Sequence, residues 1–183
     1  MQTALPGCML LMVFTLCASA QSNLCDELSQ AVRYAKNDFS SIKGAQSSGS
    51  DMPNMFDSTF SIASVDSDCS LVCSDDQPRA LGLICSKSYY APRHMSAEEA
   101  EQGSEAFFNA LTRDVKGCVS ERFPAAQFGT LRNNSGREDI SATGFGQSAN
   151  GFDIEIRVEH RCRSAHDVES CYVNLDVDLE SQE

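Results

Sequence analysis

Two short stretches carry residue types at spacings that could form a serine nucleophile site, and both are incomplete. Ser40 and Lys43 stand at the Ser-x-x-Lys spacing of serine acyl-enzymes, but the sequence has neither the Ser-Asp-Asn nor the Lys-Thr-Gly motif that completes such a site. Gly146 and Ser148 begin a G-x-S-x-G pattern, in which Asn150 replaces the last glycine. We therefore predict no catalytic residue and regard an enzyme as the less favoured class.

The three histidines suggest two further kinds of site, a metal site and a hydrolase site built from loops. His160 and Cys162, together with Cys171, could supply three zinc ligands, but a structural zinc takes four and the spacing marks no fourth. His94 and His166 lie in predicted loops, where either could meet a nucleophile and a carboxylate. A histidine among apolar strand positions, as His160 is, more often belongs to the core, so we expect no metal and no other cofactor.

Carboxylates crowd the polar positions of the last two predicted strands, residues 152–162 and 171–180. Apolar and polar residues alternate there with a period of two, which is typical of an antiparallel pair with one buried face. If the connecting loop is symmetric, Cys162 lies opposite Cys171, within reach of a cross-strand disulfide. Arg157 then lies opposite Asp176.

The same register sets two pairs of like charges against each other at the open end of this hairpin. Glu155 lies opposite Asp178, and Asp153 lies opposite Glu180. Like charges directly opposite each other destabilise a strand pair, so we predict that these four carboxylates bind a partner. Two alternatives stay open: a charged strand edge that resists aggregation, and a calcium site, for which the chain has no loop of known ligand spacing.

The charge of the chain lies wholly after residue 20 and favours a cationic partner protein. The formal net charge is −12, which disfavours nucleic acid because nucleic-acid-binding proteins need a basic surface. An apolar run at 10–16 followed by Ala18 and Ala20 predicts a signal peptide over 1–20, with a retained apolar anchor as the alternative. Residues 21–183 would then be a single exported domain without a membrane span, periplasmic in a bacterium and otherwise secreted. Its oligomeric state is unknown.

Cysteines are numerous enough for a disulfide framework. Of the nine, two lie in the predicted signal peptide, which leaves 9 − 2 = 7. In an exported protein such cysteines are typical of disulfides, and an odd number leaves one without a partner in the chain. A turn centred near Gln77 would place Cys69 opposite Cys85. We therefore predict the pairs Cys69–Cys85 and Cys162–Cys171, and the spacing does not decide the others.

Two helices and a set of strands are expected to position these residues. Apolar spacing predicts amphipathic helices at 22–44 and 96–123. Lys43 and Gly44 are typical of a helix end, and Ser96 with Glu99 forms a capping box. Alternation predicts strands at 55–65, 66–73, 80–90, 127–132 and 139–145 before the final pair. The expected fold is therefore α+β, with both helices packed on one antiparallel sheet that disulfides stabilise.

The two halves, 21–92 and 93–183, share a plan of one helix followed by about three strands. A duplicated α-βββ unit is therefore a hypothesis, and a non-equivalent strand order in the halves would contradict it. For function, we expect a non-catalytic exported binding protein, in the form of an acidic inhibitor or immunity-type protein that docks on a cationic enzyme or toxin. The alternatives are a small exported hydrolase and a structural protein of the cell envelope.

Overall fold

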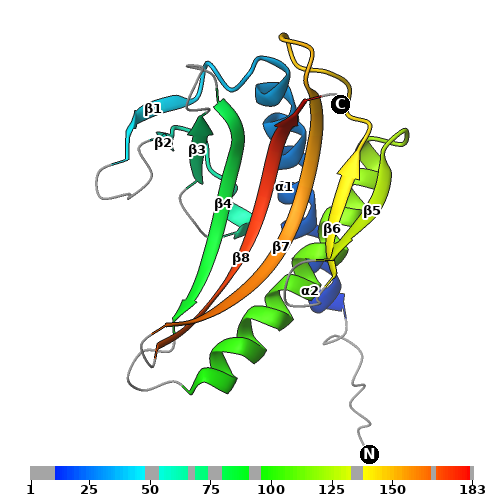
Figure 1. Ribbon diagram of the computed structural model, residues 1–183. Helices are drawn as coiled ribbons and strands as arrows, with labels where there is room; N and C mark the ends of the chain where they lie inside the picture. The colour runs from blue at the N-terminus through cyan, green and yellow to red at the C-terminus, as the bar shows by residue number, and fades with distance from the viewer. Residues whose placement is uncertain are drawn as a thin grey trace, which may run out of the picture.

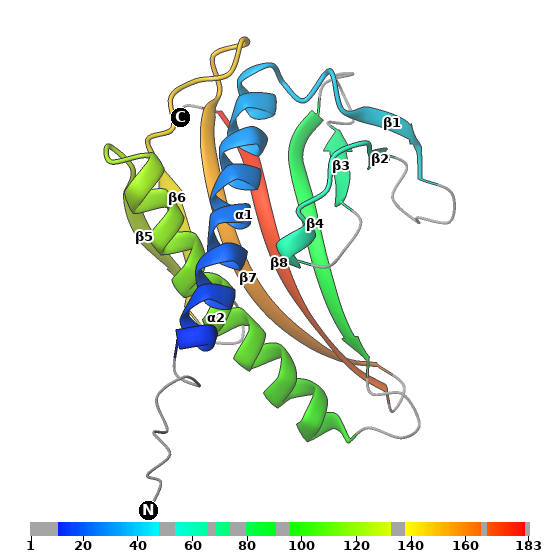
Figure 2. The ribbon, with the colours of Figure 1, turned by 180° about the vertical axis from the view of Figure 1, so that it is seen from behind.

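In the described part of the chain, two long helices pack on one face of an antiparallel sheet of eight strands (Figure 1). The computed structural model describes residues 11–47, 54–65, 69–73, 80–90, 96–132, 138–165 and 168–181, and the side chains of most of these from residue 23 onward. The strand order is β1-β2-β3-β4-β8-β7-β6-β5. This is the α+β class that the sequence predicts, and it leaves one face of the sheet without a helix (Figures 1 and 2).

The first helix, α1 (Leu11–Lys36), differs from its prediction at both ends. It begins at Leu11 rather than at a cap near Ser22, and it ends at Lys36 rather than Gly44. Asp38 and Phe39 take positive φ angles of 51° and 55°, a conformation that stops a helix. Phe39 still reaches the core, where it is fully buried, so the apolar spacing continued past the true end of the helix.

Residues after this turn form a strand that the sequence analysis missed, β1 (Lys43–Gln46), which pairs with β2 (Met55–Ser58). Gly44 allows this pairing, because a Cβ atom there would lie 2.7 Å from the carbonyl oxygen of Asp57. The predicted strand at 55–65 is also too long. The Ser58 hydroxyl bonds both the N–H and the carbonyl of Phe60, which turns the chain into a short 3-10 helix, η1 (Ala63–Val65).

The remaining elements lie close to their predicted positions. Strands β3 (Cys69–Cys73) and β4 (Ala80–Tyr90) complete the first half. Helix α2 (Ala97–Arg122) starts at the predicted capping box, in which Glu99 N–H donates to Ser96 Oγ and Ser96 N–H donates to the Glu99 carboxylate. The second half continues with β5 (Gln127–Arg132), β6 (Glu138–Thr143), β7 (Asp153–Ala165) and β8 (Val168–Glu180).

Each half of the described chain is a helix followed by four antiparallel strands, rather than the three expected. The last strands of the halves, β4 and β8, pair at the middle of the sheet, so the strand order of the two halves is equivalent. Disulfides occupy equivalent places as well: Cys69–Cys85 joins β3 to β4 and Cys162–Cys171 joins β7 to β8. A third disulfide, Cys25–Cys118, joins the two helices.

The core lies between the sheet and the helices (Figure 2). Leu28 and Val32 of α1 and Val115 of α2 meet the inward residues of β4, β7 and β8, which alternate as the sequence predicts. The seventh cysteine, Cys73, is unpaired and buried in this core. The inner face thus consists mainly of packing residues, with Lys87 of β4 over the ring of Phe107 as a charged exception. The carboxylates of β7 and β8 from Asp153 to Glu159 and from Asp176 to Glu180 point to the face that no described helix covers.

Candidate docking face

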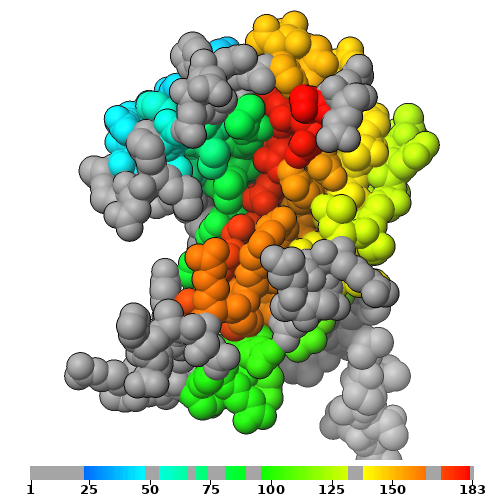
Figure 3. Space-filling model, viewed as in Figure 1, coloured from blue at the N-terminus to red at the C-terminus, as the bar shows by residue number. Residues whose placement is uncertain are grey.

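The central feature of the uncovered face is the β7–β8 hairpin, whose register is the predicted one. Glu155 lies opposite Asp178, Asp153 opposite Glu180, and Arg157 opposite Asp176. In Figure 3 the side chains of β4, β8 and β7 form the surface that faces the viewer. We call six carboxylates of this surface the acidic face: Asp153, Glu155, Glu159, Asp176, Asp178 and Glu180.

The acidic face is in the middle of the sheet and not at its edge. The edge strands are β1 and β5, while β8 and β7 each have a strand on both sides. Charges that protect a sheet from edge-to-edge aggregation belong on an edge strand, so that explanation does not apply to these residues.

Among the described residues of β3 and β4, the equivalent strand pair of the first half, there is no such cluster. The outward residues of β3 and β4 opposite one another are small or neutral: Ser70 and Val72 on β3, and Gly82, Ile84 and Ser86 on β4. The two halves therefore share a backbone plan, but the described outward residues of these two strand pairs differ in charge.

One arginine holds three carboxylates of the acidic face. Arg157 places Nη2 2.6 Å from Asp178 and 2.5 Å from Glu180, and its Nε lies 3.4 Å from Glu155 without donating a hydrogen bond to it. Burial lowers the pKa of Arg157, but the charges of Asp178, Glu155, Glu180 and Asp176 outweigh burial and raise it. Arg161 is occupied by Glu159, at 2.9 Å. Arg157 and Arg161 therefore both pair with carboxylates of the acidic face, while a third arginine on the same side of β7, Arg163, lies over the ring of Tyr172.

Asp178 lies flat on the sheet because its neighbour is a glycine. A Cβ atom at Gly82, the residue opposite Asp178 on β4, would clash with the Asp178 carboxylate. Burial raises the pKa of Asp178 to about 6, against the lowering effect of Arg157. The carboxyl of Asp178 thus lies close to β4 at Gly82 and titrates at about pH 6 although Arg157 binds it.

Asp176 has no ion pair among the described residues. It is 6% exposed, and its Oδ1 is buried without a hydrogen-bond partner. Burial raises the pKa of Asp176 well above its ordinary value, and Asp178 and Glu159 raise it further, while Arg157 and Arg161 lower it. The register placed Arg157 opposite Asp176 correctly, but the guanidinium turns toward the open end of the hairpin.

A cleft of about 580 Å³ opens beside the acidic face, at the end where β6 stops and β7 begins. Its lining includes Asp153, Glu155 and Glu180, together with Thr143 and the backbone around Gly144. Three of the four carboxylates that the sequence analysis chose as partner-binding residues therefore line one concave site, and Asp178 lies next to it, opposite Glu155.

No protein family, curated protein or solved structure matches the chain.

No helix in the described part of the chain has both the length and the apolar character needed to cross a bilayer.

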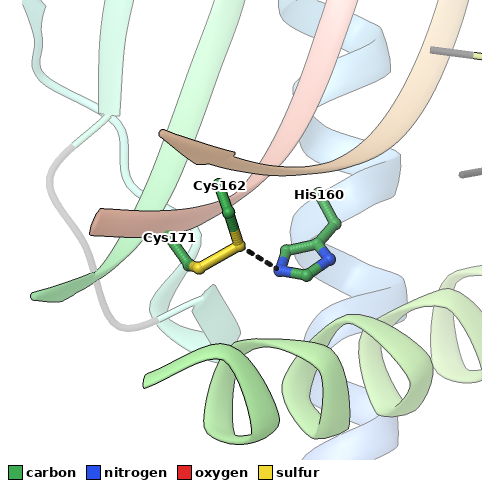
Figure 4. A group of neighbouring side chains, drawn as sticks. All are labelled: His160, Cys162 and Cys171. Atoms are coloured by element: carbon green, nitrogen blue, oxygen red, sulfur yellow. Dashed lines mark hydrogen bonds between the residues drawn. A yellow bond between two sulfur atoms is a disulfide. The ribbon is translucent and has the colours of Figure 1, made fainter. Parts of the chain in front are cut away.

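Two of the three candidate zinc ligands, Cys162 and Cys171, form a disulfide with each other (Figure 4). His160 Nε2 lies 3.6 Å from Cys162 Sγ, and that sulfur is bonded to Cys171. Zinc binds thiolates, and neither sulfur of a disulfide is a thiolate. His160 is instead a core residue that stacks on Phe108, as its apolar neighbours indicate.

A Ser–His contact missed by the sequence analysis lies in the core. Ser104 Oγ is 2.8 Å from His160 Nε2 and also donates to the carbonyl of Glu101. Asp139 accepts a hydrogen bond from the backbone N–H of His160. Ser104 is fully buried and His160 is 1% exposed, so no substrate can reach this pair as it stands. A serine two turns into α2 and a histidine in β7 carry no local sequence signal of their contact.

The other candidates have structural roles or lie outside the described residues. Lys43 places Nζ 3.7 Å above the ring of Phe56, and Ser148 accepts hydrogen bonds from the backbone of the turn before β7. His94 and His166 fall outside the described residues, so a hydrolase site built on them stays a hypothesis.

Proposed function

We propose that the protein is a non-catalytic binding protein whose acidic face docks on a cationic partner protein. The observation that carries the proposal is the gathering of six carboxylates around two arginines on an uncovered sheet face, at a place where strand register sets like charges opposite each other. Such an arrangement costs stability in the free protein. A partner that supplies lysine or arginine side chains would remove that cost.

The charge of the whole chain acts in the same direction. With a net charge of −12, the protein attracts a basic partner over a distance of about one Debye length, about 8 Å at physiological salt. Complementary charge of this kind raises the rate of association and suppresses wrong partners. An inhibitor or immunity-type protein that covers the site of a basic enzyme or toxin fits these properties.

Export of the protein is part of the same proposal. Three disulfides are typical of proteins that fold in an oxidising compartment, and the apolar start of the chain supports cleavage after Ala20 and export. Mass spectrometry of the exported protein tests this. An N-terminus at Gln21 is expected, and a retained Met1 would contradict cleavage.

We also propose that the chain is a duplicated α-ββββ unit. The equivalent strand order and the equivalent disulfides of the third and fourth strands support this. Superposition of the two halves tests it. Helices that cross their sheets at different angles in the two halves would contradict it.

Charge reversal on the acidic face tests the binding proposal. The double variant Glu155→Lys, Asp178→Lys should bind the basic peptide hexalysine at least about tenfold more weakly. The control is Glu98→Lys, Glu105→Lys on the exposed surface of α2, which changes the net charge equally, from −12 to −12 + 4 = −8. Equal losses in the two variants would mean that only net charge matters and would contradict a specific face.

A further inference from the structure

The acidic face contains one carboxylate, Asp176, that has no ion pair among the described residues and whose Oδ1 has no hydrogen-bond partner. Its Oδ1 has no hydrogen-bond partner and almost no contact with solvent, and the residue as a whole is more than nine-tenths buried. Buried carboxylates are normally paired or hydrogen-bonded. An unpartnered one at the centre of a surface that already gathers negative charge points to a ligand that completes it.

The neighbours of Asp176 on each packed strand explain why it lacks a partner. On β4 the residue opposite is Ile84, and the adjacent outward residues are Gly82 and Ser86, none of which carries a charge. On β7 the residue opposite is Arg157, flanked by Glu155 and Glu159. On β8 itself the outward neighbours are Asn174 and Asp178.

Both arginines near Asp176 are held elsewhere. The guanidinium of Arg157 binds Asp178 and Glu180, and that of Arg161 binds Glu159 through both Nε and Nη2. In strand register, Asp176 therefore lies between Ile84 on β4 and Arg157 on β7. No described helix covers this face of the sheet, and the side chains of β4, β8 and β7 form the surface that faces the viewer in Figure 3.

We propose that Asp176 is the central binding residue of the acidic face and binds the ammonium group of a lysine from the partner protein. A lysine fits because its ammonium is a compact charge on a long apolar stem, and the stem can pack on Ile84 while the ammonium reaches the carboxylate. This inference rests on the proposed function and adds which residue of the face recognises which group of the partner.

Binding of this kind releases a proton. Burial, Asp178 and Glu159 raise the pKa of Asp176 in the free protein, which favours the neutral form of its carboxyl. A bound ammonium favours the ionised form and lowers that pKa. Affinity should therefore increase with pH while free Asp176 is protonated, and become constant above the free pKa. Asp178, with a pKa of about 6, also titrates on the acidic face, so the two carboxyl groups must be followed separately.

The test uses the full chain with hexalysine as the probe. Calorimetric titration between about pH 5 and about pH 8, in two buffers of different ionisation enthalpy, gives both the affinity and the number of protons released. Asp176→Asn keeps the shape and removes the charge, and Glu105→Gln on exposed α2 surface is the matched control. We expect Asp176→Asn to lose about tenfold or more in affinity, together with its proton release, and the control to lose about twofold or less.

Carboxyl NMR on the unmodified protein makes the test independent of any variant. The Asp176 carboxyl resonance should titrate at lower pH when hexalysine is bound. An unchanged titration would contradict the proposal that Asp176 binds a lysine ammonium. If Asp176→Asn binds as well as the control while Glu155→Lys, Asp178→Lys still loses binding, the role proposed for Asp176 is wrong and the docking face stands. If neither variant differs from its control, both proposals fail.

Discussion

Arg157 lies directly opposite Asp176 on neighbouring strands, but its guanidinium binds Asp178, 2.6 Å away, and Glu180 at the open end of the hairpin. One cation thus stabilises several carboxylates that repel one another, and the carboxylate nearest to it in register stays without a partner. Most of the following predictions depend on this unequal sharing of charge.

Replacement of Arg157, which binds several carboxylates at once, should destabilise the fold mainly at neutral pH. Arg157→Gln leaves Glu155, Asp178 and Glu180 to repel each other, and we expect a loss of about 2 kcal/mol, between the values for exposed and buried pairs. Urea unfolding measures it. Arg113→Gln, an exposed residue of α2 paired with Asp114, is the control and should lose about 0.5 kcal/mol or less. A loss for Arg157→Gln no larger than that of the control would contradict this role.

Asp178 should make the fold less stable as the pH rises from about 4 to about 6. Its folded pKa is about 6, above the ordinary value of 3.8, so the folded state binds more protons than the unfolded state in this range. The stabilising effect is present near pH 4 and is lost as the pH rises through 6, with an upper limit of about 3 kcal/mol. The difference in unfolding free energy between Asp178→Asn and the natural protein should therefore shift in favour of the variant as pH rises. A difference that is independent of pH would show that Asp178 titrates normally.

A side chain at Gly82 should disturb Asp178 through direct contact. In Gly82→Ala the new Cβ would meet the Asp178 carboxylate, and we expect a loss of about 1–3 kcal/mol. The double variant Gly82→Ala, Asp178→Ala should recover part of it. Gly103→Ala on α2, where a Cβ meets Tyr89 at an ordinary 3.6 Å, should gain up to about 1 kcal/mol from helix propensity. Additive losses in the double variant would mean that the two residues do not interact.

The helix–helix disulfide should stabilise the fold more than the hairpin disulfide. Cys25–Cys118 closes a loop with a sequence separation of 93, against 9 for Cys162–Cys171. Chain entropy alone gives about 4.7 and about 2.7 kcal/mol for loops of these lengths. Guanidinium unfolding of the two double Cys→Ala variants compares them. A smaller loss for Cys25→Ala, Cys118→Ala would reverse the prediction.

The strands of the second half could be predicted because their signals are local. The alternation from Ile154 to Val158 and the cysteines at the neck specify both the buried face and the register, since a shift by one residue would expose every apolar side chain. Helix α2 was equally clear, because Ser96 and Glu99 mark its start in the sequence itself.

The errors occurred where distant residues decide the local structure. Phe39 continues the helical spacing of α1, but it reaches the core through a turn at Asp38, and Gly44 serves strand pairing with Asp57 rather than helix capping. The Arg157 contacts could not be read from register either. An arginine reaches several carboxylates, and the strand register does not say which of them it binds.

The footprint of a basic peptide tests the docking face most directly. Hexalysine is titrated into isotope-labelled protein at low salt, and the amide shifts are assigned along the chain. The proposal predicts the largest shifts in β4, β7 and β8 around Glu155, Asp176 and Asp178, and their reduction as salt is added. Shifts centred on the helices, or spread over all exposed acids alike, would contradict the docking face.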